Sequence, residues 1–394
     1  MAITALSPSL KGLLESELGA WSSEHAPSHL RRVCMVSLNK EGSKYVIPLC
    51  ECTKDSLNQV GGKNANLGEM ISQGFAVPDG FAISVKAYER ALKGILDEVC
   101  SKLKELCSTD LSAVDESSNQ IGELIRSVRI PGDIKEEIHQ HYTELSKQCN
   151  MDDVPVAVRS SATAEDLPGA SFAGQQDTYL WIRGMDNLMD AVIDCWASLF
   201  TSRAICYRIK QCFDHENVML SVCVQQMINP TVAGVMFTIN PVNGDRSKIM
   251  IGGNWGLGES VVSGSVNPDE WMVDKVILEI SKRMVLPKTV MHVVDLEKEE
   301  VVVKDVQPEK QDIPCLSDEE IIELAKIGKA IEHHYGTPQD IEWAIDRDLP
   351  FPQNIFIVQT RPETVWSGRK TKPVVGDRGT LSGQVCSYLT KLKT

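Results

Sequence analysis

The chain has 394 residues, of which 42% are hydrophobic and 24% charged, and its formal net charge is −14. This composition is typical of a globular protein with two or three lobes, and no apolar run is long enough to predict a bilayer-spanning helix. The acidic balance argues against a broad nucleic-acid-binding surface, although one ATP needs only a few well-placed cations and backbone N–H groups. The N-terminus has no secretory pattern, so we expect a cytoplasmic protein without nucleic-acid or membrane partners.

Twelve cysteines are scattered along the chain. Cys50 and Cys52 form the only close pair, and no Cys/His cluster has the spacing of zinc ligands. Without a signal peptide, free buried thiols are favoured over structural disulfides.

The chain begins with a polar N-terminal extension, residues 1–42, in which one short amphipathic helix is expected near residues 10–21. A strand at residues 45–49 opens the first lobe, residues 43–215. A glycine-containing turn at residues 60–62 then leads into a helix that Gly74 ends. The other elements expected in this lobe are a strand at 75–84, helices near 86–106, 113–129 and 133–148, a strand at 154–158 and a helix at 188–210.

From residue 216 the pattern becomes rich in strands, and residues 218–224 alternate with period two. A capping box at Ser317–Glu320 begins a helix that ends before Gly336. Mixed α/β followed by mostly antiparallel α+β predicts two lobes, 43–215 and 216–367, with a ligand between them. Further strands are expected at 234–239, 249–251, 270–273 and 300–303, and a last hairpin at 340–345 and 355–360.

A candidate phosphate cradle follows the strand that ends near Arg159. The planar guanidinium of Arg159 suits an anion, and Gly174, in a loop of small and hydroxylic residues, allows close backbone approach. A solvated loop with a surface arginine explains the composition equally well. The glycine cluster at residues 252–259 lacks a Walker lysine and is weak evidence for a second phosphate loop.

The predicted C-terminal hairpin carries a second constellation of polar residues. Strand alternation places Asp340 and Glu342 on one face of its first strand, and Gln359 and Arg361 on one face of its second. If these faces coincide, two carboxylates, an amide oxygen and a guanidinium converge, which suits Mg²⁺ beside a triphosphate. A structural salt bridge on a solvated sheet face is the alternative.

Five motifs occur in the order in which one known family has them. They resemble the ATP-binding domain of phosphoenolpyruvate synthase, which pyruvate phosphate dikinase, rifampicin phosphotransferase and phenylphosphate-synthase-type enzymes share. The resemblance covers about residues 45–366 and implies an ATP-grasp fold that clamps the nucleotide between two lobes. The motifs are Gly61–Glu69, Val158–Ala164, Ala173–Thr178, Gly256–Glu259, and Asp340–Trp343 together with Gln359–Thr364.

The resemblance also implies a role for each candidate site residue. Those implied for the phosphates are Lys63, Arg159 and Arg361, with the loop residues Gly174, Gln175, Gln176, Asp177 and Thr178. Those implied for the nucleoside are Gln226, Met227 and Ile228 at adenine and Glu259 at the ribose. Glu342 and Gln359 would be the Mg²⁺ ligands, with Asp340 nearby. The catalytic group, Lys63, Arg159 and Arg361, would act by positioning and charge neutralisation.

The family passes phosphate through a histidine in a Gly-Gly-x-Thr-x-His-like context, and none of the eight histidines here has that setting. The resemblance therefore implies the ATP-cleaving component of a dikinase, a phosphotransferase that needs a phosphohistidine domain or subunit in trans. Onward transfer to pyruvate or to a hydroxylated acceptor such as a phenol is expected, and residues 368–394 would be a linker or the start of the missing histidine domain. The alternative is a nucleotide-binding regulatory module without turnover, against which the intact site residues count.

Overall fold

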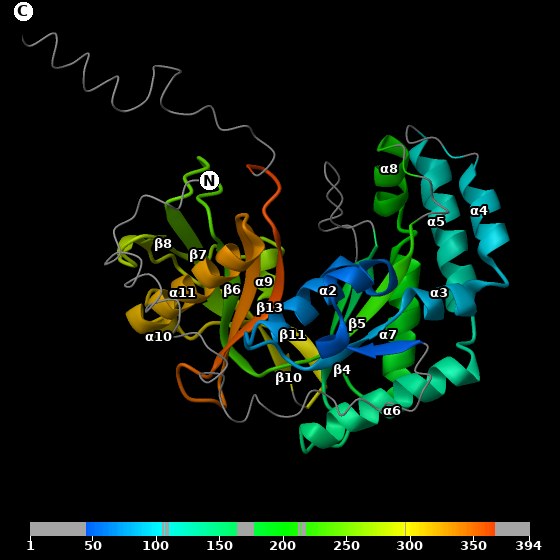
Figure 1. Cartoon of the computed structure of the whole chain (residues 1–394), viewed down its shortest axis with the longest axis horizontal. Coiled ribbons are helices and arrows are strands. Elements are labelled where there is room, and N and C mark those ends of the chain that lie inside the picture. The colour runs from blue at the N-terminus through cyan, green and yellow to red at the C-terminus, as the bar shows by residue number, and fades with distance from the viewer. Residues whose placement is uncertain are drawn as a thin grey trace, which may run out of the picture.

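The computed structural model describes residues 45–104, 106, 110–163, 177–211, 213, 218–295 and 297–366. Two lobes lie side by side, and helix α2 lies between them (Figure 1). Each lobe combines an antiparallel sheet with helices, which confirms the α+β class. Within the described part of the chain, no helix has both the length and the apolar character that a bilayer span requires.

The first lobe is built on a five-stranded sheet in the order β1-β2-β5-β3-β4, and all neighbouring strands are antiparallel. Strand β5 follows the predicted lobe division at residue 215, yet it is the central strand of this sheet. The sheet therefore takes strands from both sides of that division. The strands are β1 (Val46–Pro48), β2 (Gly80–Ile83), β3 (Val156–Ala162), β4 (Thr178–Ile182) and β5 (Leu220–Gln226).

Helices α3 to α8 provide the apolar faces of the first core, in which Trp196 is fully buried. Two helices expected from the sequence are each divided in two. The second division occurs where the Thr201 hydroxyl accepts the N–H of Ala204 at 3.3 Å and caps a new helix. The helices are α2 (Leu57–Ser72), α3 (Val85–Leu92), α4 (Leu96–Lys104), α5 (Leu111–Arg126), α6 (Gly132–Gln148), α7 (Met185–Ser198) and α8 (Ser202–Lys210), with short 3₁₀ turns at Leu49–Glu51 and Lys54–Ser56.

The second lobe is built on a six-stranded antiparallel sheet in the order β13-β12-β6-β7-β8-β9. The predicted capping box is present at its long helix α11, because the Ser317 N–H donates to Glu320 Oε2 at 2.8 Å. The strands are β6 (Pro230–Phe237), β7 (Lys248–Trp255), β8 (Asp269–Asp274), β9 (Ile280–Met284), β12 (Gln339–Asp346) and β13 (Ile355–Pro362). The helices are α9 (Glu259–Val262), α10 (Pro308–Gln311) and α11 (Asp318–Tyr335), and a separate hairpin is formed by β10 (Val290–Asp295) and β11 (Glu300–Asp305).

Helix α2 joins the two lobes through a second core. Its buried Leu67 and Met70 belong to the same apolar cluster as Trp343 of β12 and Ile357 of β13. The predicted glycine turn is a break within this helix, where Gly61 has φ 73° and ψ 169°. Beyond the break the helix lies against β3, and Lys63 is in the first turn after the break.

Gly61→Ala is expected to lower the free energy of unfolding by more than about 2 kcal/mol. A Cβ at Gly61 would lie 2.2 Å from the backbone oxygen of Ser161, and its φ is disfavoured for any other residue. Gly74→Ala is the matched control, because Gly74 has φ +81° and open space around the added Cβ. Urea unfolding of both variants measures the difference. Equal losses of unfolding free energy in the two variants would show that the close approach of Gly61 to Ser161 is not what makes the glycine necessary.

Candidate nucleotide site

A cavity of about 390 Å³ lies between the two lobes. Strands β3 and β4 line it from the first lobe, and β12 and β13 line it from the second. Most of the residues predicted for the site contribute to its wall. They are Lys63, Arg159, Thr178, Gln226, Met227, Ile228, Glu259, Glu342, Gln359 and Arg361.

Arg159 connects the two lobes at the cavity. Its Nη2 donates to Glu342 Oε2 at 2.9 Å and to Gln359 Oε1 at 2.6 Å, and its Nη1 donates to the carbonyl of Val358 at 3.0 Å. The side chains of Arg159 and Glu342 are only 12% and 19% exposed, so their attraction is screened less than that of a surface pair. A cationic fork from one lobe is thus held at the two predicted metal ligands of the other.

The pairing of β12 with β13 confirms that the polar faces of the hairpin coincide. Glu342 is paired with Gln359 and Asp340 with Arg361, and a bulge follows Glu342. Arg361 donates to Asp340 Oδ2 at 2.8–2.9 Å. Burial raises the pKa of Asp340 even though the neighbouring Arg361 lowers it. Arg361 lines the cavity and Asp340 does not, so the pair is a structural salt bridge, but with the Asp340 side chain only 14% exposed the sheet face is not the solvated one of the alternative.

Glu342 and Gln359 fit the donor chemistry of Mg²⁺ only in part. They offer one carboxylate and one amide oxygen, and the described residues contain no group of three His, Cys, Asp or Glu side chains that could hold a metal. Mg²⁺ commonly uses one or two protein oxygens and completes its shell with phosphate oxygens and water. The pair therefore suits a metal that arrives with a triphosphate, and not a permanently bound ion.

Lys63 reaches the cavity from the part of α2 that follows the break at Gly61. Its Nζ donates to the carbonyl of Ser160 at 2.9 Å, one residue from Arg159 on β3. The Ser160 hydroxyl in turn donates to the carbonyl of Asp177 at 3.4 Å. Two cations thus lie beside the start of the predicted phosphate loop. Its residues Gly174, Gln175 and Gln176 lie outside the described residues, whereas Thr178 opens β4 and lines the cavity.

The predicted adenine hinge lies at the end of β5. The N–H of Gln226 donates to Asp79 at 2.7 Å, and the N–H of Met227 donates to Pro155 at 2.9 Å. Because these two donors already bond to protein carbonyls, recognition of a base at Gln226 and Met227 would use carbonyl oxygens and apolar contact.

Several apolar wall residues were not predicted from the sequence, among them Leu180 of β4 and Leu257 beside α9. The run Thr178–Ile182 is rich in aromatic and β-branched residues, which is the signal that could have identified β4. Glu259 lines the cavity with its side chain half exposed, and its Oε2 lies 3.5 Å from Nδ1 of His292. An apolar wall beside the three cations Lys63, Arg159 and Arg361 suits a nucleoside triphosphate, which combines a flat base with anionic phosphates.

Residues 57–379 match the family described as pyruvate phosphate dikinase, AMP/ATP-binding domain. Three relatives are each 44% identical to this chain. A probable phosphoenolpyruvate synthase of Staphylothermus marinus aligns over 385 residues, covering 91% of this chain and 46% of the relative. The phosphoenolpyruvate synthases of Pyrococcus furiosus and Helicobacter pylori align over 353 and 345 residues, covering 80% and 82% of this chain and 43% and 42% of each relative.

The chain thus spans a little less than half the length of these curated relatives. The family match includes nearly all of both lobes and every cavity residue named above. On these grounds the chain belongs to the pyruvate phosphate dikinase AMP/ATP-binding domain family.

Proposed function

We propose that this chain binds Mg·ATP in the cavity between its lobes, cleaves it, and transfers phosphate to a histidine on a partner domain or subunit. The observation that carries the proposal is the contact of Arg159 with both Glu342 and Gln359, which joins a cation of one lobe to metal-type ligands of the other. Phosphoryl transfer depends mainly on positioning and on neutralising charge around the phosphates, and this arrangement provides both.

The proposal gives the charged and polar residues of the cavity separate roles. Lys63, Arg159 and Arg361 bind the phosphates, while the apolar wall and the carbonyls of the hinge hold the adenine. Glu342 and Gln359 hold Mg²⁺, which when bound would neutralise phosphate charge. In this structure Arg159 forms an ion pair with Glu342, so these two charges compensate each other.

The onward acceptor is proposed from the relatives. Their name, phosphoenolpyruvate synthase, favours pyruvate over a phenol as the compound that finally receives the phosphate. The histidine that carries the phosphate is proposed to belong to a phosphohistidine domain or subunit, because none of the eight histidines of this sequence has the Gly-Gly-x-Thr-x-His-like context.

The test is to incubate the chain with Mg·ATP labelled separately on the β- and γ-phosphates, alone and with the histidine domain of a phosphoenolpyruvate synthase. Label on the partner's histidine, with AMP and phosphate as products, is the expected result. The labelled position distinguishes dikinase chemistry from a simple kinase.

The same histidine domain paired with its own ATP-binding domain serves as the positive control. If that pair transfers phosphate and this chain binds ATP without transfer to histidine domains from several relatives, the result favours the nucleotide-binding regulatory module. Absence of ATP binding would refute the proposed function altogether.

A further inference from the structure

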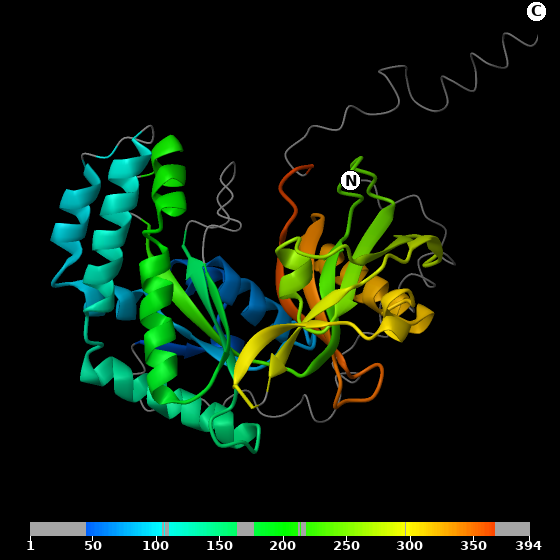
Figure 2. The same cartoon turned by 180° about the vertical axis from the view of Figure 1, so that it is seen from behind.

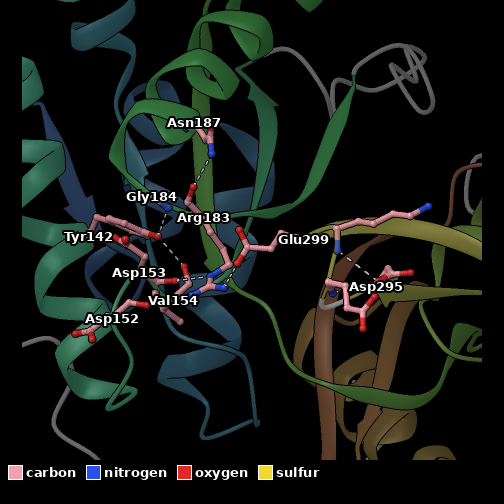
Figure 3. Close-up of polar contacts among 11 residues, drawn as sticks. Tyr142, Asp152, Asp153, Val154, Arg183, Gly184, Asn187, Asp295 and Glu299 are labelled. Carbon is pink, nitrogen blue, oxygen red and sulfur yellow. Dashed lines mark hydrogen bonds and ion pairs between the residues drawn. The ribbon is translucent and has the colours of Figure 1, made fainter.

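The β10–β11 hairpin extends from the second lobe toward the first (Figure 2). Near its base, His292 forms a parallel bridge with Gly256, and its carbonyl accepts the N–H of Leu257 at 2.8 Å. At its tip, the carboxylate of Glu299 forms an ion pair with the guanidinium of Arg183, which follows β4 (Figure 3). One hairpin thus touches both lobes.

Contacts within the first lobe hold the Arg183 side chain in place, independently of its ion pair with Glu299. Its Nε donates to the carbonyl of Asp153 at 3.1 Å, and its Nη2 donates to that of Asp152 at 3.4 Å. Its own carbonyl accepts the side-chain amide of Asn187 at 2.9 Å (Figure 3). A guanidinium fixed in this way loses little further conformational freedom when it pairs with a carboxylate.

The loop that holds Arg183 is anchored to helix α6. The hydroxyl of Tyr142 donates to the carbonyl of Val154 at 2.9 Å and accepts the N–H of Gly184 at 3.0 Å (Figure 3). Arg183 therefore presents its charge from a rigid part of the first lobe.

Three residues at or near the contact between the hairpin and the first lobe have strained backbone conformations. Asp153, Trp181 and Glu299 have φ of 53°, 59° and 54°, and they are three of the five non-glycine residues with positive φ in the described part of the chain. Such conformations cost about 1–3 kcal/mol each and persist only where the surrounding structure holds them. The hairpin turn supplies such support, because the carboxylate of Asp295 accepts the N–H groups of Glu297 and Lys298 at 3.1 and 3.4 Å.

The hairpin contacts Arg183 in the first lobe and Gly256 in the second, and each of these residues is close in sequence to residues that line the nucleotide cavity. Thr178 and Leu180 line the cavity shortly before Arg183, and Leu257 and Glu259 line it directly after Gly256. A displacement of the hairpin tip would therefore change the separation of the two walls.

We propose that the β10–β11 hairpin is a strap that holds the wall at Leu257 and Glu259 against β4, and that the contact of Arg183 with Glu299 fastens it. Arg183 is then a positioning residue for nucleotide binding, which it influences without touching the ligand. The inference rests on the proposed function in one respect, namely that the ligand of the cavity is Mg·ATP.

The size of the effect follows from exposure. The side chains of Arg183 and Glu299 are 36% and 58% exposed, so their ion pair belongs to the weak, solvent-screened class. Pairs of that class change an equilibrium by at most about fivefold. We expect Mg·ATP to bind about threefold more weakly and to leave faster when the contact is lost, and we expect the difference to shrink at high salt.

The experiment compares Glu299→Ala, Arg183→Ala and the double variant with Arg283→Ala. Arg283 is the matched control because it pairs with Asp318 within the second lobe and is similarly exposed. Calorimetry gives the dissociation constant of Mg·ATP, and stopped-flow mixing with a fluorescent ATP analogue gives its release rate. We expect weaker binding in both single variants, no further loss in the double variant, and no change in Arg283→Ala.

Glu299→Ala leaves the carbonyl contacts of Arg183 untouched, so it tests the strap even if Arg183→Ala unfolds. Hydrogen exchange without nucleotide gives a second readout: the amide of Leu257 and those of residues 290–295 should exchange faster in Glu299→Ala than in Arg283→Ala. Parental binding together with parental exchange in Glu299→Ala would overturn the strap and leave the proposed function intact. A parent chain that fails to bind ATP would instead refute the proposed function, while the exchange data would still decide whether the hairpin fastens the two walls.

Discussion

Replacing Glu342 with alanine is expected to lower the rate of ATP cleavage at least about a thousandfold while the fold stays intact. Glu342 lies on β12, between β13 and β6, with its side chain facing the cavity rather than the core. The variant would lose both the proposed metal ligand and the anion that holds Arg159. The guanidinium would keep Gln359 and the carbonyl of Val358, so the lobes should stay joined.

Arg361→Ala is expected to have a similarly large effect, because Arg361 is the proposed contact of the transferred phosphates and its side chain also lies on the polar face of the hairpin. Rates of AMP and phosphate formation measure the activity of both variants, and urea unfolding measures their stability.

Asp274→Ala is the control for the loss of an ion pair at comparable exposure. Asp274 pairs with Lys248 at 2.7 Å on the same sheet, with side chains 22% and 23% exposed, and neither residue lines the cavity. This variant should cleave ATP like the parent. Should Glu342→Ala fail to fold, Glu342→Gln keeps the shape and removes the charge. Parental turnover in both Glu342→Gln and Arg361→Ala would refute the site assignment.

Lys288→Met is expected to lower the free energy of unfolding by about 3–5 kcal/mol. The side chains of Lys288 and Asp269 are fully buried, and Nζ lies 2.7 Å from Oδ1 of Asp269. The same carboxylate accepts the N–H groups of Leu286 at 3.0 Å and Cys315 at 2.9 Å. Removing the ammonium would leave a buried anion whose remaining partners are neutral donors, among them these two N–H groups and the thiol of Cys315.

The double variant Asp269→Asn with Lys288→Met separates the charge from the packing. Its amide oxygen can still accept from the backbone, and no unpaired charge remains, so we expect it to be more stable than Lys288→Met alone. Thermal and urea unfolding measure the series. A loss below about 1 kcal/mol in Lys288→Met would mean that water or a rearranged side chain compensates the carboxylate.

The local features of the fold were predictable from the sequence because they depend on neighbouring residues. Strand alternation alone placed Asp340 and Glu342 on one face, and the observed register then joined that face to Gln359 and Arg361. The capping box at Ser317 and the stop at Gly336 were also confirmed, since each depends on chemistry within a single helical turn.

Features that depend on distant residues left no periodic signal. Lys63 donates to Ser160, which is 97 residues away, and Arg183 meets Glu299 across 116 residues. The buried ion pair of Asp269 with Lys288 was not predicted, because the local sequence gives no sign that either charged residue is buried. The break at Gly61 inside α2 likewise results from the close approach of β3, and the local sequence indicates only a turn.

The second core, which α2 shares with β12 and β13, has a consequence for the order of events during synthesis. Asn66 of α2 donates to the carbonyl of Thr360 across 294 residues, whereas the first core is complete once residue 224 has been made. Translation adds about 5–20 residues per second, so roughly 15–60 seconds separate the synthesis of α2 from that of β12 and β13. A ribosome-bound chain would therefore carry a finished first core beside a helix whose face toward β12 and β13 is still uncovered, and protection of that face by a chaperone would matter most until β13 has been made.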